Sequence, residues 1–166
     1  MLRVLLSLTL GGAIILSAQA DLGEAEAKAR EATPYKAAEI MDLPPTKLAE
    51  ILADPDASDF EKAKACQRLA VVGGRKSVPA LAALLTNDKL SHYARTALET
   101  IGDPAADVAL LESVESLEGD LLIGVINSIG RREYPGSLEA LSKLRHHKDQ
   151  SVAEAASAAL GRLRSP

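Results

Sequence analysis

Apolar residues recur at helical spacing through most of the chain, and the pattern repeats about every 30 residues. Four helical segments each end in a glycine, and these glycines lie 29, 28 and 31 residues apart, at Gly73, Gly102, Gly130 and Gly161. A shorter apolar segment precedes each of them. A hairpin of two such helices cannot bury its apolar face alone, so neighbouring hairpins have to stack. The pattern therefore predicts an all-α fold of about four stacked helical hairpins, over residues 44–74, 75–103, 104–132 and 133–166.

One face of the second helix in each hairpin is expected to form the core. The positions one, four and eight before each glycine share one side of a helix. Eleven of these twelve positions are apolar, the exception being Ser157. They are Val72, Leu69 and Ala65, then Ile101, Leu98 and Ala94, then Ile129, Ile126 and Leu122, then Leu160, Ser157 and Ala153. Truncation of Leu98 or Ile101 should therefore destabilise the fold.

The first 20 residues have the features of a secretory signal peptide. Arg3 is followed by an apolar run over residues 4–17 and then by Ala18-Gln19-Ala20, an A-x-A cleavage pattern. The apolar run is shorter than the roughly 20 residues of a membrane span. We expect cleavage before Asp21 and an exported, periplasmic or extracellular protein with no membrane span after cleavage; an uncleaved anchor is the alternative.

Residues 21–43 are predicted to form an N-terminal helical segment. Residues 21–32 are polar, with oppositely charged side chains four residues apart. Thr33-Pro34 then opens a short helix that Pro44-Pro45 stops. We expect residues 35–43 to cap the first hairpin and residues 21–33 to be mobile.

Helix ends are marked by capping residues and glycines. Ser58 and Ser151 each precede a glutamate by three residues, which predicts two capping boxes. Asp103 precedes a first-turn proline, and Ser91 is expected to cap its own helix. Four glycines are expected in the left-handed conformation just past a helix end, namely Gly73, Gly102, Gly119 and Gly130. Gly161 differs, because Arg162-Leu163-Arg164 extends the last helix.

Composition agrees with helices and excludes several functions. The chain contains 29 alanines and 26 leucines but only one Phe, three Tyr and no Trp. Its formal net charge is −4. An acidic chain with few aromatic side chains lacks the basic surface and stacking groups that nucleic-acid binding requires. A single cysteine excludes an internal disulfide framework.

The segments VPALAALLTNDKLSHYARTALETIG (78–102) and LEALSKLRHHKDQSVAEAASAALG (138–161) resemble HEAT-like repeats, in the short form that phycobilisome lyases also contain. The resemblance implies a right-handed α-solenoid and a protein-binding scaffold. That family usually has arginine eight positions before the glycine, whereas this chain has Ala65, Ala94, Leu122 and Ala153. We therefore expect these repeats to stack through apolar contacts alone.

Candidate chemical groups are few, and no catalytic, cofactor-binding or metal-binding residue is assigned. His146 and His147 are adjacent on a helix, so their rings do not converge on a metal. Residues 54–58 have the spacing of the first calcium ligands but lack the glycine and the glutamate of that loop, which favours an inter-helix turn. Cys66 is interpreted as a small residue at a helix interface; an intermolecular disulfide or bilin attachment is the alternative.

The sequence predicts a protein-binding groove on the helix face opposite the core, which the resemblance places on the concave side of the stack. Positions three, six and ten before each glycine carry no Lys or Arg and are mostly small, which is unusual for a solvated helix face. The candidate binding residues are Gln67, His92, Thr96, Glu99, Asp120, Gly124, Asn127, Ser151 and Ala155. The predicted function is an exported, non-enzymatic scaffold without a cofactor, which binds another protein or a second copy of itself. The alternative is a cofactor-handling accessory or lyase-like subunit for a chromophore or haem.

Overall fold

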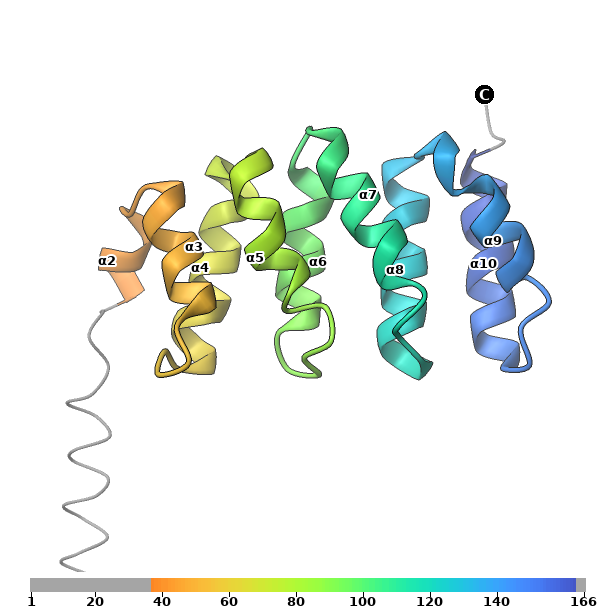
Figure 1. Ribbon diagram of the computed structural model, residues 1–166, viewed down its shortest axis with the longest axis horizontal. Helices are drawn as coiled ribbons and strands as arrows, with labels where there is room; N and C mark the ends of the chain where they lie inside the picture. The colour runs from red at the N-terminus through yellow and green to blue at the C-terminus, as the bar shows by residue number, and fades with distance from the viewer. Residues whose placement is uncertain (1–36, 164–166) are drawn as a thin grey trace, which may run out of the picture. The chain divides into compact units, whose positions relative to one another are not determined.

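A computed structural model describes residues 37–163, and this part of the chain is all-α, with no strand (Figure 1). The first helices are α2 (Ala37–Met41), α3 (Pro45–Ala53), α4 (Asp59–Val72), η1 (Arg75–Ser77), α5 (Val78–Ala82) and α6 (Ser91–Thr100). They are followed by α7 (Pro104–Ser113), α8 (Gly119–Arg132), η2 (Pro135–Ser137), α9 (Leu138–Leu144) and α10 (Gln150–Leu163). None of these helices is both long and apolar enough to cross a membrane.

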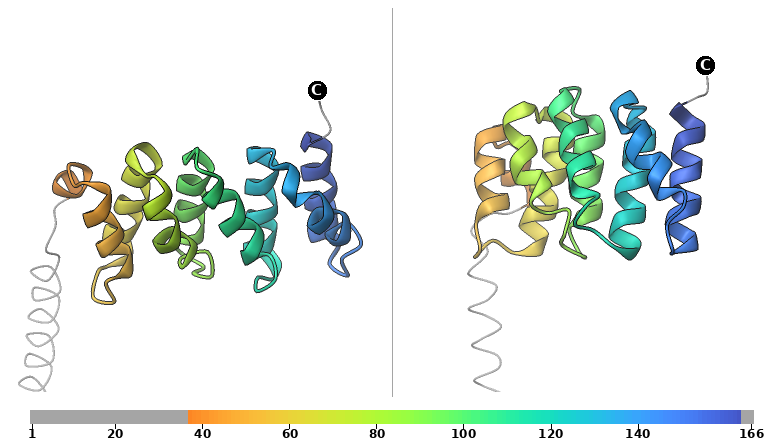
Figure 2. Two further views of the ribbon diagram at one scale, coloured as in Figure 1. Left: turned by 45° about the horizontal axis from the view of Figure 1, so that its top comes forward. Right: turned by 45° about the vertical axis from the view of Figure 1, so that its right-hand side comes forward.

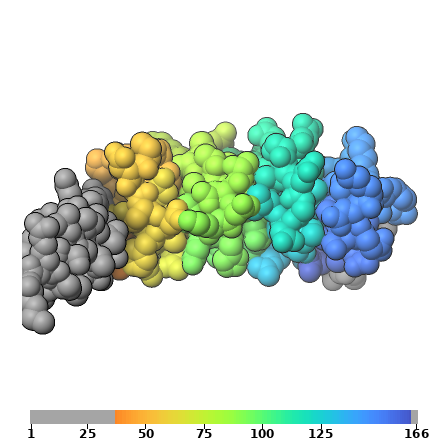
Figure 3. All heavy atoms as spheres, turned by 90° about the horizontal axis from the view of Figure 1, so that it is seen from below, coloured from red at the N-terminus to blue at the C-terminus, as the bar shows by residue number. Residues whose placement is uncertain are grey.

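The helices from α3 onward pack in consecutive pairs. The pairs are α3 with α4, α5 with α6, α7 with α8, and α9 with α10. In Figure 1 the first helix of each pair lies in front of the second, and Figure 2 shows the same pairing from two other directions. The second helices pack on one another in chain order, α4 on α6, α6 on α8 and α8 on α10. From below, the atoms of successive pairs follow one another from yellow to blue (Figure 3).

The buried face of the second helices follows the predicted register in α4, α6 and α8. Leu69, Leu98 and Ile126, four residues before the glycines, have no exposed surface. Val72, one residue before Gly73, is only half-buried. In α10 Leu160 is buried as predicted, but Ala153 is half-buried and Ser157 is exposed, and the other buried residues are Val152, Ala156 and Ala159. This helix packs mainly on α8 and α9.

The N-terminal edge of the described part is covered by α2. This short helix packs against α4, and its Ile40 is completely buried in the common core. The predicted signal peptide, the segment 21–33 and the start of the segment 35–43 lie outside the described residues. The expectation that residues 35–43 cover the first hairpin agrees with the position of α2.

Two of the predicted caps are present and two are not. Ser58 and Glu61 form the capping box of α4, and Asp103 accepts a hydrogen bond from the Ala105 amide at the start of α7. The box predicted at Ser151 is wrong. The carboxylate of Asp149 lies one residue before α10 and accepts from the Ser151 amide at 2.9 Å instead.

The cap predicted at Ser91 is also wrong. Asn87 Oδ1 accepts from the Lys89 amide at 2.9 Å and the Leu90 amide at 3.0 Å. Asn87, four residues before Ser91, thus satisfies the free backbone amides that precede α6. Ser91 is already inside the helix and buried, and its Oγ has no hydrogen-bond partner in the described structure.

The glycine predictions are mostly wrong. Gly73, Gly102 and Gly130 do not have positive φ, and the left-handed residue that ends α8 is Glu133, with a φ of 51°. Gly119 does have a φ of 53°, but it begins α8. Gly130 lies inside α8, where a Cβ would come within 2.9 Å of Ala159 Cβ on α10, so its small size permits close helix packing. The predicted extension of the last helix past Gly161 is confirmed.

Candidate functional site

The nine candidate binding residues divide into a cluster and four separate positions. Five of them line one cavity of about 400 Å³ between α6, α8 and α10, namely His92, Thr96, Glu99, Gly124 and Asn127. The other four do not line it: Gln67, Asp120 and Ser151 are exposed and Ala155 is half-buried. The structure therefore brings together the candidates of the second and third repeats.

The same cavity is lined by three arginines that the sequence analysis missed, Arg95, Arg131 and Arg162. These arginines do not stand three, six or ten residues before a glycine, but a guanidinium reaches across neighbouring positions of its helix. A signal was present, because arginine directly follows the glycine in the last two repeats, at Arg131 and Arg162. The predicted groove floor of small residues is therefore covered by positively charged side chains.

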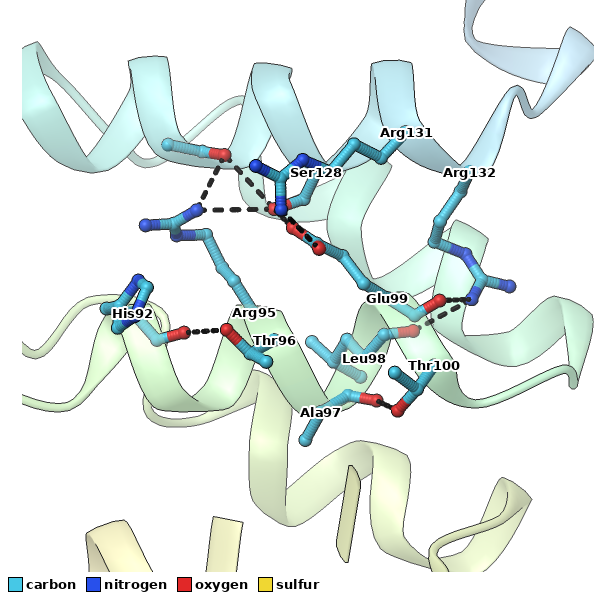
Figure 4. A network of polar contacts seen from close by, with 11 residues as sticks. His92, Arg95, Thr96, Ala97, Leu98, Glu99, Thr100, Ser128, Arg131 and Arg132 are labelled. Atoms are coloured by element: carbon cyan, nitrogen blue, oxygen red, sulfur yellow. Dashed lines mark hydrogen bonds and ion pairs between the residues drawn. The ribbon is translucent and has the colours of Figure 1, made fainter. Parts of the chain in front are cut away.

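Arg95 crosses from α6 to α8 (Figure 4). Its Nη1 donates to the carbonyl oxygen of Gly124 at 3.1 Å and to Ser128 Oγ at 3.3 Å. A Cβ on residue 124 would lie 2.7 Å from the Arg95 Cζ, so only glycine leaves room for the guanidinium in this position. The guanidinium of Arg95 thus lies over the buried Gly124. This contact and the hydrogen bonds to Gly124 and Ser128 fix the orientation of the Arg95 side chain.

The environment of Arg95 disfavours its positive charge. Partial burial lowers the pKa of Arg95, the nearby Glu99 carboxylate opposes that effect, and the positive charge of Arg131 adds to it. The Arg95 Nε is buried without a hydrogen-bond partner, and its Nη2 makes no hydrogen bond within residues 37–163. The guanidinium therefore has unused donor capacity.

Glu99 is the one carboxylate that lines the cavity. Ser128 Oγ donates to its Oε1 at 2.7 Å, and Arg131 Nη1 donates to its Oε2 at 3.0 Å (Figure 4). The Glu99 side chain is 14% exposed, whereas that of Arg131 is 67% exposed. The cavity therefore holds a carboxylate between a hydroxyl and a guanidinium, and most of Arg131 faces solvent.

Arg162 and His92 are the most exposed of the basic side chains that line the cavity on α10 and α6. Arg162 is exposed near the end of α10, and it makes no hydrogen bond or ion pair within the described residues. His92 is exposed near the start of α6, where its backbone carbonyl accepts from Thr96 Oγ1 at 2.9 Å. Three guanidinium groups thus face one carboxylate across the cavity, which leaves an excess of positive charge suited to an oxyanion.

A fourth arginine, Arg132, does not line the cavity but joins α8 to α7 and to the end of α6. Its guanidinium is paired with Asp107, with Nε to Oδ1 at 2.5 Å and Nη2 to Oδ2 at 2.9 Å, and both side chains are nearly buried. Its Nη1 donates to the carbonyl oxygens of Leu98 at 2.8 Å and Glu99 at 3.1 Å, at the end of α6 (Figure 4). It also donates to the carbonyl oxygen of Ile101, just past the helix, at 2.6 Å. These carbonyls have no partner within their own helix.

The expectation that the repeats stack through apolar contacts alone is therefore wrong. Arg132 joins α8 to the end of α6 and to α7, and Arg95 joins α6 to the middle of α8. Neither arginine stands eight residues before a glycine, which is the only position that the prediction considered. Arginine side chains are long, so guanidinium groups at other helix positions can still reach carbonyl oxygens of the neighbouring helix.

The other chemical candidates stand apart from this cavity. The described residues contain no cluster of three or more His, Cys, Asp or Glu side chains arranged to hold a metal ion. Asp54 accepts from the Asp56 amide in the turn before α4, and His147 Nδ1 accepts from the Asp149 amide. Cys66 is fully buried, and burial raises its pKa to about 12.

Comparison with family models, with curated proteins and with solved structures gives no match. The resemblance to HEAT-like repeats therefore stays a prediction from the sequence.

Proposed function

We propose that the chain is an exported, non-enzymatic protein-binding module. Its binding surface is the face of α6, α8 and α10 that contains this cavity. We further propose that its helix pairs form a right-handed α-solenoid of HEAT-like repeats. The ordered packing of α4, α6, α8 and α10 supports this arrangement, because each pair contacts mainly its neighbours along the chain. A repeat of this kind presents an extended surface that a partner can follow.

The observation that carries the proposal is the cavity shared by three successive pairs. His92, Arg95, Thr96 and Glu99 come from one pair, Gly124, Asn127 and Arg131 from the next, and Arg162 from the last. Its side chains are hydrogen-bonding groups, and its one carboxylate is already engaged by Ser128 and Arg131. Such a lining is suited to binding a polar group of a partner.

A photo-crosslinking experiment tests the proposal. Benzoylphenylalanine replaces Thr96 or Ala158, which are exposed on α6 and α10, in the full chain expressed in its native host. The matched control is Glu112, which is exposed on α7 in the other layer of helices. We expect one discrete crosslinked species from Thr96 and Ala158 and none from Glu112. Equal crosslinking from all three positions, or none from any, contradicts the proposal.

The proposed export is tested separately. The N-terminal sequence of the protein from a secreting host should begin at Asp21. A cytosolic protein that retains Met1 contradicts it.

A further inference from the structure

We infer that the cavity between α6, α8 and α10 binds a carboxylate side chain from an acidic segment of the partner protein, through Arg95, Arg131 and Arg162. This inference rests on the proposed function, since it names the chemistry by which the partner is recognised. The cavity, at about 400 Å³, has room for a side chain and its immediate neighbours.

Charge complementarity points to an anion. Three guanidinium groups and one carboxylate line the cavity, so it has a formal excess of two positive charges. The chain as a whole has a net charge of −4, so the sign of the cavity is opposite to that of the chain. A cleft lined by one sign of charge concentrates ions of opposite charge and steers their approach.

The hydrogen bonds already present indicate which anion fits. Ser128 and Arg131 hold the two oxygens of Glu99 from different sides, at 2.7 and 3.0 Å. The site thus already accommodates a planar carboxylate. Arg95 Nη2 and the guanidinium of Arg162 make no hydrogen bond within residues 37–163, so they are available for a second carboxylate.

The orientation of Arg95 is fixed before a ligand arrives. Its Nη1 is held by the Gly124 carbonyl oxygen and by Ser128, and the absence of a side chain on Gly124 makes this position accessible. A guanidinium that is already oriented loses little conformational entropy on binding. Gly124 is therefore a positioning residue for Arg95.

Binding of fluorescein-labelled hexaglutamate to the full chain tests the inference directly, by fluorescence anisotropy at low salt. Labelled hexaglutamine is the uncharged control peptide. We expect saturable binding of hexaglutamate that weakens with added salt, and no binding of hexaglutamine. Binding of both peptides alike overturns the inference, as does the absence of binding to either.

Variants locate the bound peptide. Arg131→Gln and Arg162→Gln remove cations from the cavity at exposed positions, and Arg145→Gln removes an exposed cation beyond the end of α9. Each cavity variant should weaken hexaglutamate binding by about tenfold, the loss of one charge-assisted contact. Arg145→Gln should change it by less than about twofold, because the charge lies outside the cavity. Equal effects of all three variants place the peptide elsewhere and overturn the inference.

Gly124→Ala provides a steric test that removes no charge. The added Cβ displaces the flexible end of Arg95, so hexaglutamate binding should weaken while circular dichroism stays unchanged. Unchanged binding overturns the role of Arg95. Inorganic phosphate is the competing probe: if it binds more tightly than hexaglutamate, the site is one for phosphate, and the assignment to a carboxylate is wrong.

The two proposals fail in different ways. If the crosslinks from Thr96 persist unchanged in the Arg131→Gln/Arg162→Gln variant, a partner still binds this face and the carboxylate inference is overturned. If the chain without arginine substitutions gives no crosslinks from Thr96 or Ala158 but binds hexaglutamate, the protein-binding proposal fails. The cavity is then a carboxylate site, but the inference that a partner protein supplies the carboxylate is overturned. Loss of both the crosslinks and hexaglutamate binding in the double variant supports both.

Discussion

The contacts of α8 with its two neighbours of the same layer are of opposite kinds. Toward α6, long side chains cross the interface: Arg132 reaches three carbonyl oxygens at and just past the end of α6, and Arg95 reaches the Gly124 carbonyl. Toward α10, Gly130 lies close to Ala159 and to the end of the Arg162 side chain, and no side-chain hydrogen bond joins α8 to α10 in the described structure. One helix thus uses hydrogen-bonded guanidinium groups on one side and a close contact without side-chain hydrogen bonds on the other.

A shared apolar register therefore does not make the interfaces between successive helix pairs equivalent. The positions four and eight before the glycine are buried in α4, α6 and α8, yet the hydrogen bonds between α6 and α8 have no counterpart between α8 and α10 within the described residues. The cavity lies where these two interfaces adjoin. Arg95 and Arg131 come from the interface of α6 with α8, where both are hydrogen-bonded, and the exposed Arg162 comes from α10.

The largest expected effect comes from Arg132→Met, which breaks the polar interface. The change leaves Asp107 nearly buried without its partner and leaves three carbonyl oxygens at and just past the end of α6 without their donor. Loss of one member of a buried ion pair costs about 3–5 kcal/mol. Urea unfolding should show a loss of this size.

Lys143→Met is the matched control for Arg132. Lys143 pairs with Glu139 on the surface of α9, where both side chains are largely exposed. Such pairs contribute about 0–1 kcal/mol, so the change should hardly alter the midpoint of unfolding. Similar losses in both variants contradict the view that Arg132 joins the repeats.

Leu98→Ala tests the apolar part of the same interface. Leu98 is completely buried on α6 and lies in the predicted core register. Truncating a buried leucine costs about 2–5 kcal/mol, the lost burial together with the cavity that remains. Thermal unfolding is the measurement, and an unchanged unfolding temperature would mean that the register is wrong.

A smaller effect is expected at the close contact between α8 and α10. Gly130→Ala places a Cβ 2.9 Å from Ala159 Cβ, 3.0 Å from Ala159 Cα and 3.0 Å from Arg162 Nη1, so α10 and the end of the Arg162 side chain both have to shift. Overpacking of this kind costs about 1–3 kcal/mol. Gly161→Ala is the control on α10, since its Cβ meets no atom within 4 Å and helix propensity favours alanine by up to about 1 kcal/mol. Equal destabilisation by both changes contradicts close packing at Gly130.

The smallest effect at neutral pH concerns Cys66 on α4. Burial raises the pKa of this thiol from 9.0 to about 12, so the folded protein binds the proton more tightly than the unfolded chain does. The resulting stability is fully present below pH 9 and is lost as the pH rises from 9 toward 12. Cys66→Ser should remove this part of the pH dependence, measured by urea unfolding between pH 8 and pH 11. An unchanged alkaline slope in the variant contradicts the burial of the thiol.

The periodic part of the fold was accessible from the sequence. The helical content, the helix pairs and the buried positions of α4, α6 and α8 follow from apolar spacing, because burial of a helix face depends on residue type at fixed intervals. The burial of Val152, Ala156 and Ala159 in α10 was not accessible, because it depends on which neighbours that helix has.

Five of the eight residues that line the cavity followed from the same spacing. His92, Thr96, Glu99, Gly124 and Asn127 lie on the predicted face and line one cavity. The arginines were missed because the position of a guanidinium depends on how far a long side chain extends and on which carbonyl oxygens it finds. That information resides in the packing of two helices, as the fit of Arg95 over Gly124 shows.

The most direct test of the proposed carboxylate site is an NMR titration that observes the arginine side chains. The Nε–Hε signals of the ¹⁵N-labelled full chain are recorded while hexaglutamate is added. The signals of Arg95, Arg131 and Arg162 should shift in a saturable manner, while that of Arg132, whose Nε is bonded to Asp107, should stay in place. Saturable shifts of other arginines with these three unmoved, or no shifts at all, would contradict the site.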